Sequence, residues 1–279
     1  MQFPQVLKFA GLRRPSQISP KNAEHGSYVH ASVSFLFQWA AVASQLLVLD
    51  PPEDFDYDGE TCIKRLLEPS ADSRGQDPLD DLYRDEEVLG GYFKSQETQD
   101  LFRSVVGQLI TSFEPLDFRS LITLRRHAPS DKRCDAAAVT GLLRRLGSLL
   151  SNVNSFDSIL PIVPLHTSFR DFLANKDKGG DFYVDFHDAR HQLAHSCLNL
   201  LLHPLDGLKF NICRLETSYL ANDDVQDLNT RVDEQIPPAL LYACRFWDGH
   251  LKHTDFKTDL FQKLRNSLQK EVTILAGNP

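Results

Sequence analysis

From residue 78 onward, apolar positions recur at helical spacing through most of the chain. Over 95–110 they fall on one face behind Ser95, and over 135–150 a second apolar stripe follows Asp135; serine and aspartate are favoured N-cap residues. Another helix is predicted after Pro115. Four further helices are predicted over 187–202, 208–220, 223–235 and 238–253, with a fifth over 256–275. The pattern therefore predicts a mainly α protein.

Short β-branched stretches interrupt this helical period. They lie at 152–155 with 159–164, and at 182–186 behind a Gly-Gly turn. Three helices followed by a small β-hairpin are typical of a winged helix, which we predict over 95–186. After it, short polar joints between amphipathic segments predict an antiparallel helical array over 187–279, a helical arm.

The last clear helix of this arm has its apolar residues at regular spacing. Leu240, Cys244, Trp247 and Leu251 form one stripe. Such a stripe is more often a packing face than a cofactor-binding face, so we expect it to serve in packing.

Residues 1–24 lack the features of a secretory signal and are expected to be loose, and 25–94 are expected to form a helical subdomain. No Asp, Glu, Lys or Arg occurs over 25–49, and Val33–Leu49 is predominantly apolar. The length of this run is close to the lower limit for a membrane-spanning helix, roughly 17 residues. Polar residues inside this run and the acidic stretch behind it favour a helix in a protein core. A membrane anchor remains the alternative.

Composition narrows the function classes. With 279 residues, 42% of them hydrophobic, the chain can bury a sizeable core in roughly two domains. The formal charge is −8 without a basic run, which argues against nucleic-acid binding. Five scattered cysteines without a Cys-x-x-Cys pair indicate reduced thiols and a cytoplasmic location.

Two histidine or carboxylate patterns suggest metal chemistry. His187, His191 and His195 are four residues apart, with Asp188 after the first, which resembles the His-Glu-x-x-His pattern of zinc proteases. Asp is one methylene shorter than the required Glu, so a solvated or hydrogen-bonded helix flank is favoured over a zinc-dependent hydrolase. The acidic loop 54–59 matches the first half of an EF-hand, but Arg65 stands where the bidentate Glu belongs, which leaves a partial calcium site or a helix-capping loop.

The segment 164–173 carries a histidine at the start of a short amphipathic helix. Leu165, His166, Ser168, Phe169, Asp171 and Phe172 match a histidine motif, and 208–213 (Leu-Lys-Phe-Asn-Ile-Cys) and 241–251 match two later segments. Together they resemble the fungal NACHT family of signal-transduction NTPases, relatives of the NOD-like (STAND) immune receptors. The resemblance runs from about residue 36 to residue 251 and is strongest from residue 165 onward.

The resemblance implies a fold and a function. Residues 25–94 would be the lid that closes over a nucleotide, and His166 would donate a hydrogen bond to the β-phosphate of ADP; the other matched residues would pack. The sequence contains no Gly-Lys-Ser or Gly-Lys-Thr, so it lacks the phosphate loop of the family. We therefore expect a non-catalytic region of a larger receptor, which binds no cofactor alone, meets ADP or ATP when joined to a phosphate-loop domain, and contacts other receptor domains or full-length relatives.

Overall fold

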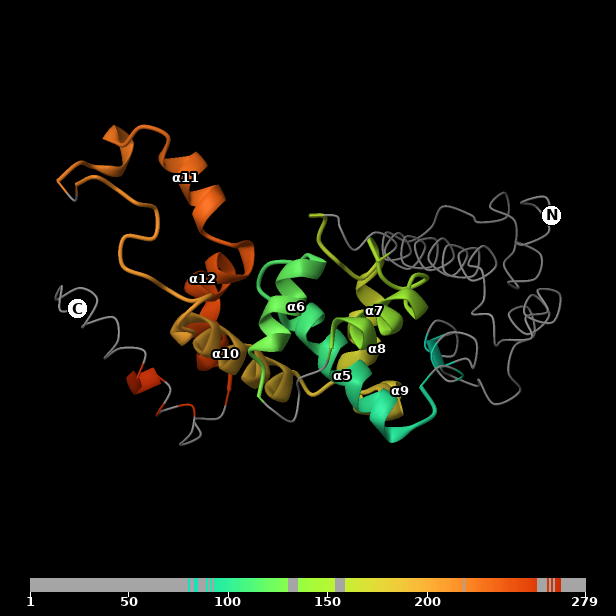
Figure 1. The fold of residues 1–279 in the computed structure, drawn as a ribbon. Coiled ribbons are helices and arrows are strands. Elements are labelled where there is room, and N and C mark those ends of the chain that lie inside the picture. Colours follow the sequence, from blue (N-terminus) through green and yellow to red (C-terminus); the bar gives the residue numbers. More distant parts are fainter. Residues whose placement is uncertain are drawn as a thin grey trace, which may run out of the picture. The chain divides into compact units, whose positions relative to one another are not determined.

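The computed structural model divides the chain into two compact units, Met1–Tyr92 and Phe93–Pro279. Only isolated residues of the first unit are described, so the fold reported below is that of the second unit (Figure 1). The described residues are 80, 83–84, 89, 91, 93–129, 135–153, 159–217, 219–254, 260, 262 and 264–266. The predicted loose segment, the Val33–Leu49 run and the EF-hand-like loop lie outside them.

The second unit is mainly helical, as predicted. Its helices are α5 (Gln96–Thr111), α6 (Phe118–Arg126), α7 (Ala136–Arg145), α8 (Thr167–Ala174), α9 (Lys176–Gly179), α10 (Phe186–Leu202), α11 (Leu228–Gln235) and α12 (Pro238–Lys252), with 3-10 turns η4 (Gly180–Phe182) and η5 (Asn222–Asp224). None of the helices in the described part of the chain combines the length and the apolarity that a membrane crossing requires.

Side-chain caps explain where several helices begin. Ser95, Asp117, Asp135 and Asp185 each accept a hydrogen bond from a backbone N–H in the first turn of the helix that follows. This contact satisfies a donor that would otherwise have no partner inside the helix. The predicted caps at Ser95 and Asp135 are thus confirmed.

Helix α10 lies at the centre of the core and packs on α5, α6 and α12. The predicted arm and the predicted winged helix therefore share one core. Gly107 permits the close approach of α5, because a Cβ added there would lie 3.1 Å from Cβ of Ala189 on α10. Since α10 has neighbours on several sides, its polar residues Gln192, His195 and Ser196 are buried together with its apolar ones.

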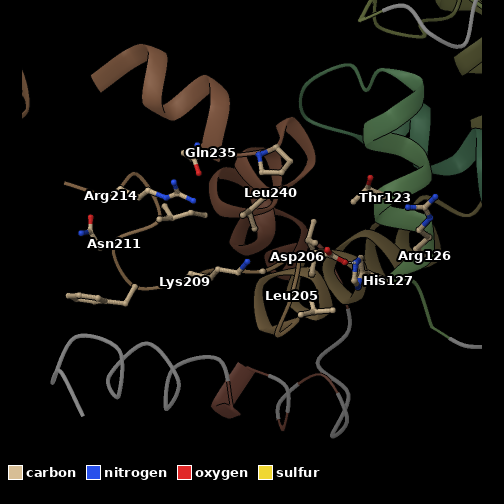
Figure 2. A pocket seen from close by; sticks show the side chains of 15 residues that line it. Thr123, Arg126, His127, Leu205, Asp206, Lys209, Asn211, Arg214, Gln235 and Leu240 are labelled. Carbon is tan, nitrogen blue, oxygen red and sulfur yellow. Dashed lines mark ion pairs between the residues drawn. The ribbon is translucent and has the colours of Figure 1, made fainter. Parts of the chain in front are cut away.

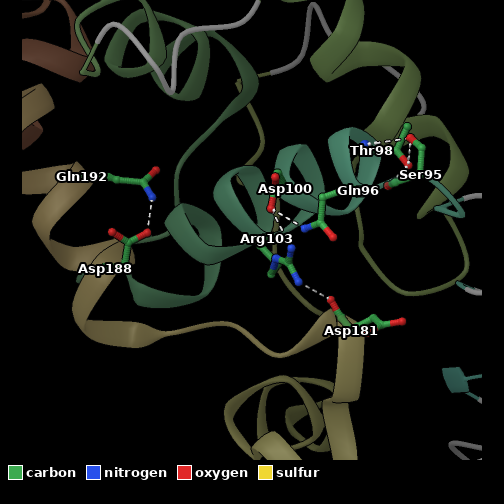
Figure 3. A network of polar contacts seen from close by, with 8 residues as sticks. All are labelled: Ser95, Gln96, Thr98, Asp100, Arg103, Asp181, Asp188 and Gln192. Atoms are coloured by element: carbon green, nitrogen blue, oxygen red, sulfur yellow. Dashed lines mark hydrogen bonds and ion pairs between the residues drawn. The ribbon is translucent and has the colours of Figure 1, made fainter.

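A buried polar network holds these helices in register. Ser104 on α5 donates to Oε1 of Gln192 (2.7 Å), and Gln192 donates from Nε2 to Asp188 (2.7 Å), a contact drawn in Figure 3. Arg125 on α6 is 1% exposed and donates to Ser104 and to Gln108, at 3.2 Å each. A buried polar group without a hydrogen bond costs free energy, so this network favours one arrangement of α5, α6 and α10.

The short elements after α8 attach to the first turns of α5. Rings of Phe93, Phe102 and Phe182 form a buried cluster with centroids 5.1 to 6.2 Å apart. At the surface, Arg103 on α5 links this helix to η4. Its guanidinium donates to the carbonyl oxygen of Asp181 (2.7 Å) and to the carboxylate of Asp100 (2.6 Å) (Figure 3).

The strand predicted at 182–186 is wrong. Phe182 ends η4 and Phe186 is the first residue of α10. Asp185 causes the change, because its carboxylate accepts from the N–H groups of His187 and Asp188 and so begins the helix. The extended backbone between Phe182 and Phe186 is attached to α8 by a hydrogen bond from Val184 N–H to Leu173 O (2.8 Å).

The other predicted strands form only isolated contacts. Residues 149–152 and 161–165 run antiparallel, with hydrogen bonds from Ser151 N–H to Val163 O and from Leu165 N–H to Leu149 O, both 2.9 Å. The described residues contain isolated bridges, such as Leu150 with Pro164, and no continuous ladder.

The helix predicted over 208–220 is also wrong. Asn211 and Arg214 have φ of 48° and 53°, in the left-handed region, which ends any right-handed helix. The Asn211 side chain closes this turn, since its Oδ1 accepts from Leu215 N–H and its Nδ2 donates to Leu215 O. The next predicted helix, over 223–235, is broken by Asp227 at φ 58° and survives as η5 and α11.

Candidate functional site

His166 lies at the N-cap of α8, where the resemblance expects a phosphate contact. The half-buried ring turns back on its own helix: Nδ1 accepts from the Ser168 N–H at 3.1 Å and lies 2.7 Å from the Ser168 hydroxyl. A ring nitrogen that accepts a backbone N–H carries no proton. The neutral ring therefore has its proton on Nε2, which makes Nε2–H the donor that His166 can offer.

Helix α8, which begins after His166, is anchored by buried side chains. Phe169 and Phe172 are each 1% exposed, and their burial agrees with the packing role expected for them. Leu165 and Asp171 differ from that expectation, because both are exposed. Arg170 lies over the ring of Phe186, 5.5 Å from its centroid, and so links the outer face of α8 to the start of α10.

The three histidines on α10 differ in their exposure to solvent. His187 is exposed, His191 is half-buried and His195 is 4% exposed, although the rings of the last two lie 4.8 Å apart. The carboxylate of Asp188 accepts a hydrogen bond from Gln192, its own neighbour on the helix. His187 is solvated, as the favoured interpretation expects, whereas His195 is buried, so a solvated flank is wrong for His195.

The predicted apolar stripe on α12 is displaced around the helix. Cys244 is exposed and Trp247 and Leu251 are half-buried, whereas Tyr242, Ala243 and His250 are buried with Leu240. The reason is that α12 is covered on the side facing α10 and α6, and Tyr242 and His250 bring their polar atoms to each other there.

Tyr242 and His250 form a buried pair that the sequence pattern does not reveal. Tyr242 Oη accepts from the Phe113 N–H (3.2 Å) and lies 2.7 Å from Nε2 of His250. Burial, followed by the positive charges of Arg190 and His253, lowers the pKa of His250 to about 4. Burial also raises the pKa of Tyr242. Both groups are therefore neutral near pH 7, and the hydrogen bond between Tyr242 Oη and His250 Nε2 is part of the core.

The thiol of Cys197, in the middle of α10, is buried and has no nucleophilic character. Burial is the main cause that raises its pKa, and Cys244 adds to this effect. The thiolate is the reactive form of cysteine, so Cys197 is a packing residue.

Comparison with protein-family models, with curated proteins and with solved structures finds no match to this chain.

Proposed function

We propose that this chain is a non-catalytic, regulatory region of a NACHT-type receptor, in which His166 contacts the β-phosphate of ADP and stabilises the inactive state. The region would couple the ADP or ATP state to activation, in fungal nonself recognition or programmed cell death. The nucleotide is held mainly by the phosphate-loop domain of such a receptor, to which this region is joined. This role implies a cytoplasmic location.

The observation that carries the proposal is the position of His166 at the N-cap of α8 and its contact with the Ser168 N–H. Its Nδ1 is occupied by the first turn of α8, which fixes the ring and leaves the proton on Nε2. An imidazole N–H aimed at a phosphate oxygen makes a charge-assisted hydrogen bond. Loss of one such bond changes the balance of a two-state protein whose states differ by a few kcal/mol.

The arrangement of elements supports the finer fold that this role requires. Helices α5, α6 and α7 precede the antiparallel segments 149–152 and 161–165, in the order of a winged helix with a small hairpin. Helices α10 and α12 would begin the helical arm. Helix α10 packs on α5 and α6, and Phe186 at its start lies against Arg170 of α8. A shift of the arm would therefore be transmitted to α8, which His166 caps, through the shared core and through this contact.

The partners of this region would be other receptor domains or full-length relatives. The charge of −8 disfavours a nucleic-acid partner. On α7, the helix in the recognition position of a winged helix, Arg144 and Arg145 are the two basic residues. We therefore propose protein contacts inside the receptor.

The test separates the capping role of His166 from its donor role. In the complete receptor, His166→Asn keeps an N-cap acceptor but removes the imidazole donor, whereas Ser168→Ala removes the hydroxyl beside Nδ1 and keeps the donor. ADP retained after purification, measured by chromatography of the released nucleotide, should fall roughly 10-fold or more in His166→Asn, since a hydrogen bond to a charged group contributes about 1.5–3 kcal/mol. Ser168→Ala should retain ADP.

Unchanged ADP content and an unchanged oligomeric state in a folded His166→Asn receptor would refute the assignment. The chain without a phosphate-loop domain should bind ADP weakly or not at all, because one histidine cannot replace the many donors of a phosphate loop.

A further inference from the structure

A pocket of about 500 Å³ opens where α6 and α10 end. Figure 2 shows His127 and Asp206 turned toward each other on one side of it. Cationic side chains also line the pocket, from Arg126, Lys209 and Arg214. His166 and the α10 histidines are not part of this lining, so the pocket is distinct from the site described above.

Three possible metal ligands meet beside this pocket: His127 comes from one part of the chain, and His203 and Asp206 come from another. His127 is the C-cap of α6, His203 is the C-cap of α10, and Asp206 lies in the turn that follows α10. Oδ2 of Asp206 is 3.2 Å from Nδ1 of His203 and 3.7 Å from Nε2 of His127, and the three ligand atoms lie within 4.8 Å of one another. Ligand atoms placed 2.0–2.2 Å from a tetrahedral zinc ion are separated by about 3.3 Å, so two of these spacings already suit such an ion.

The hydrogen bonds of the cluster leave a conflict that a metal ion would remove. The Asp206 N–H donates to Nδ1 of His203 (3.1 Å), which requires an unprotonated nitrogen. The Asp206 carboxylate then faces that same lone pair at 3.2 Å, acceptor against acceptor. A proton on Nδ1 would satisfy the carboxylate but would oppose the N–H. A metal ion would bind all three side chains. The Asp206 N–H would then lose its acceptor on His203, but Asp206 is exposed, so this N–H can donate to water instead.

Two further features favour a cation here. The C-terminal ends of α6 and α10 both meet at the cluster, and each carries partial negative charge on its last carbonyl groups. The turn that presents Asp206 is also tightly closed: Gly207 N–H donates to His203 O (2.9 Å), and a Cβ at Gly207 would lie 2.5 Å from that oxygen. Only glycine permits this turn, so Asp206 is held against His203.

We propose that His127, His203 and Asp206 bind one Zn²⁺ ion. Imidazole nitrogens are borderline ligands that suit zinc, and zinc also accepts carboxylate oxygens. Three protein ligands leave the fourth position for water or an external group. His127 and Asp206 line the pocket, so this position faces it. The cationic side chains there suit an anionic group as the fourth ligand. The ion would also join the ends of α6 and α10.

Zinc binding by the full chain tests this proposal. Equilibrium dialysis with metal analysis should give one zinc per chain, and competition with a chromophoric chelator should give its affinity. Asp206→Asn and His203→Gln should weaken binding at least 10-fold, as loss of even a supporting residue does at zinc sites. His187→Gln, an exposed histidine outside the cluster, is the matched control and should bind like the wild type.

Cobalt replaces zinc as an optical probe of the ligands. Bound Co²⁺ should give the visible bands of a four-coordinate ion without a thiolate charge-transfer band, because no cysteine belongs to the cluster. Absence of stoichiometric zinc, a thiolate band, or loss of zinc in His187→Gln alone would overturn the proposal. Circular dichroism of each variant checks folding, and His166→Asn should keep its zinc, so the outcome is independent of the nucleotide proposal.

Discussion

Helix α10 buries ten of its 17 residues, whereas in the described part of the next 35 residues, 203–217 with 219–237, only Gly207 is buried. The helix is held by packing on α5, α6 and α12 and by a buried polar network. The segment after it is held by local polar contacts, such as those of Asn211 and the exposed ion pair of Arg231 with Glu216. The comparison teaches that neighbouring parts of one chain can depend on different forces, and therefore on different perturbations.

The largest expected difference between the two regions is in thiol reactivity. Cys197 in α10 is fully buried with a raised pKa, whereas Cys213 in the turn-rich segment is half-exposed. Cys197 can be alkylated only when the core opens, so under native conditions it should react at least about 1000-fold more slowly than Cys213. Peptide mapping after timed iodoacetamide treatment measures both rates, and a urea-unfolded sample is the control. Similar native rates would show that α10 is not the stable part.

A matched pair of arginine variants sharpens the comparison in terms of stability. Arg125→Ala removes a fully buried side chain with bonds to Ser104 and Gln108 and should lower the free energy of unfolding by about 3 kcal/mol or more. Arg231→Ala removes an exposed pair with Glu216 and should leave the urea midpoint unchanged within error. Equal losses would mean that the turn-rich segment contributes to the cooperative core.

Acid should weaken the helical core before any effect on the exposed segment. The folded pKa of His250 is about 4 against 6.5 for the free side chain, so the unfolded chain binds more protons between these values. The stability due to neutral His250 is complete above pH 6.5 and is lost as the pH falls toward 4, by up to about 3 kcal/mol. Urea unfolding at several pH values measures this loss, and His250→Gln should flatten it. An equally steep dependence in that variant would assign the loss to other groups.

Local sequence signals predicted the helices well where capping and periodicity coincide. These signals act within one turn of the helix. Ser95 and Asp135 cap α5 and α7, and two prolines restrict the backbone at the start of α12. The helix predicted over 208–220 failed because its apolar spacing does not report that Asn211 closes a left-handed turn. The helical spacing in α12 correctly predicted a helix. It did not predict which face of that helix is buried, because the covering helices α6 and α10 lie far away in the sequence.

The candidate sites differ in the same way. A histidine at the start of α8 was predicted, and its tautomer follows from a contact with Ser168 two residues away. The cluster of His127, His203 and Asp206 could not be predicted, because the two histidines lie 76 positions apart in the sequence. The local signals available were a histidine at each helix end and the Asp-Gly pair at 206–207.

The turn at Gly207 limits how this chain can change during evolution. Every other amino acid would place a Cβ within 2.6 Å of three carbonyl oxygens at the end of α10, so drift at this position is blocked by sterics, before selection on any ligand acts. Gly141 on α7, with open space around its Cα, has no such restriction. An invariant glycine at position 207 among related sequences would therefore indicate that the turn is kept. Invariant histidines at 127 and 203 would indicate that the proposed metal site is kept.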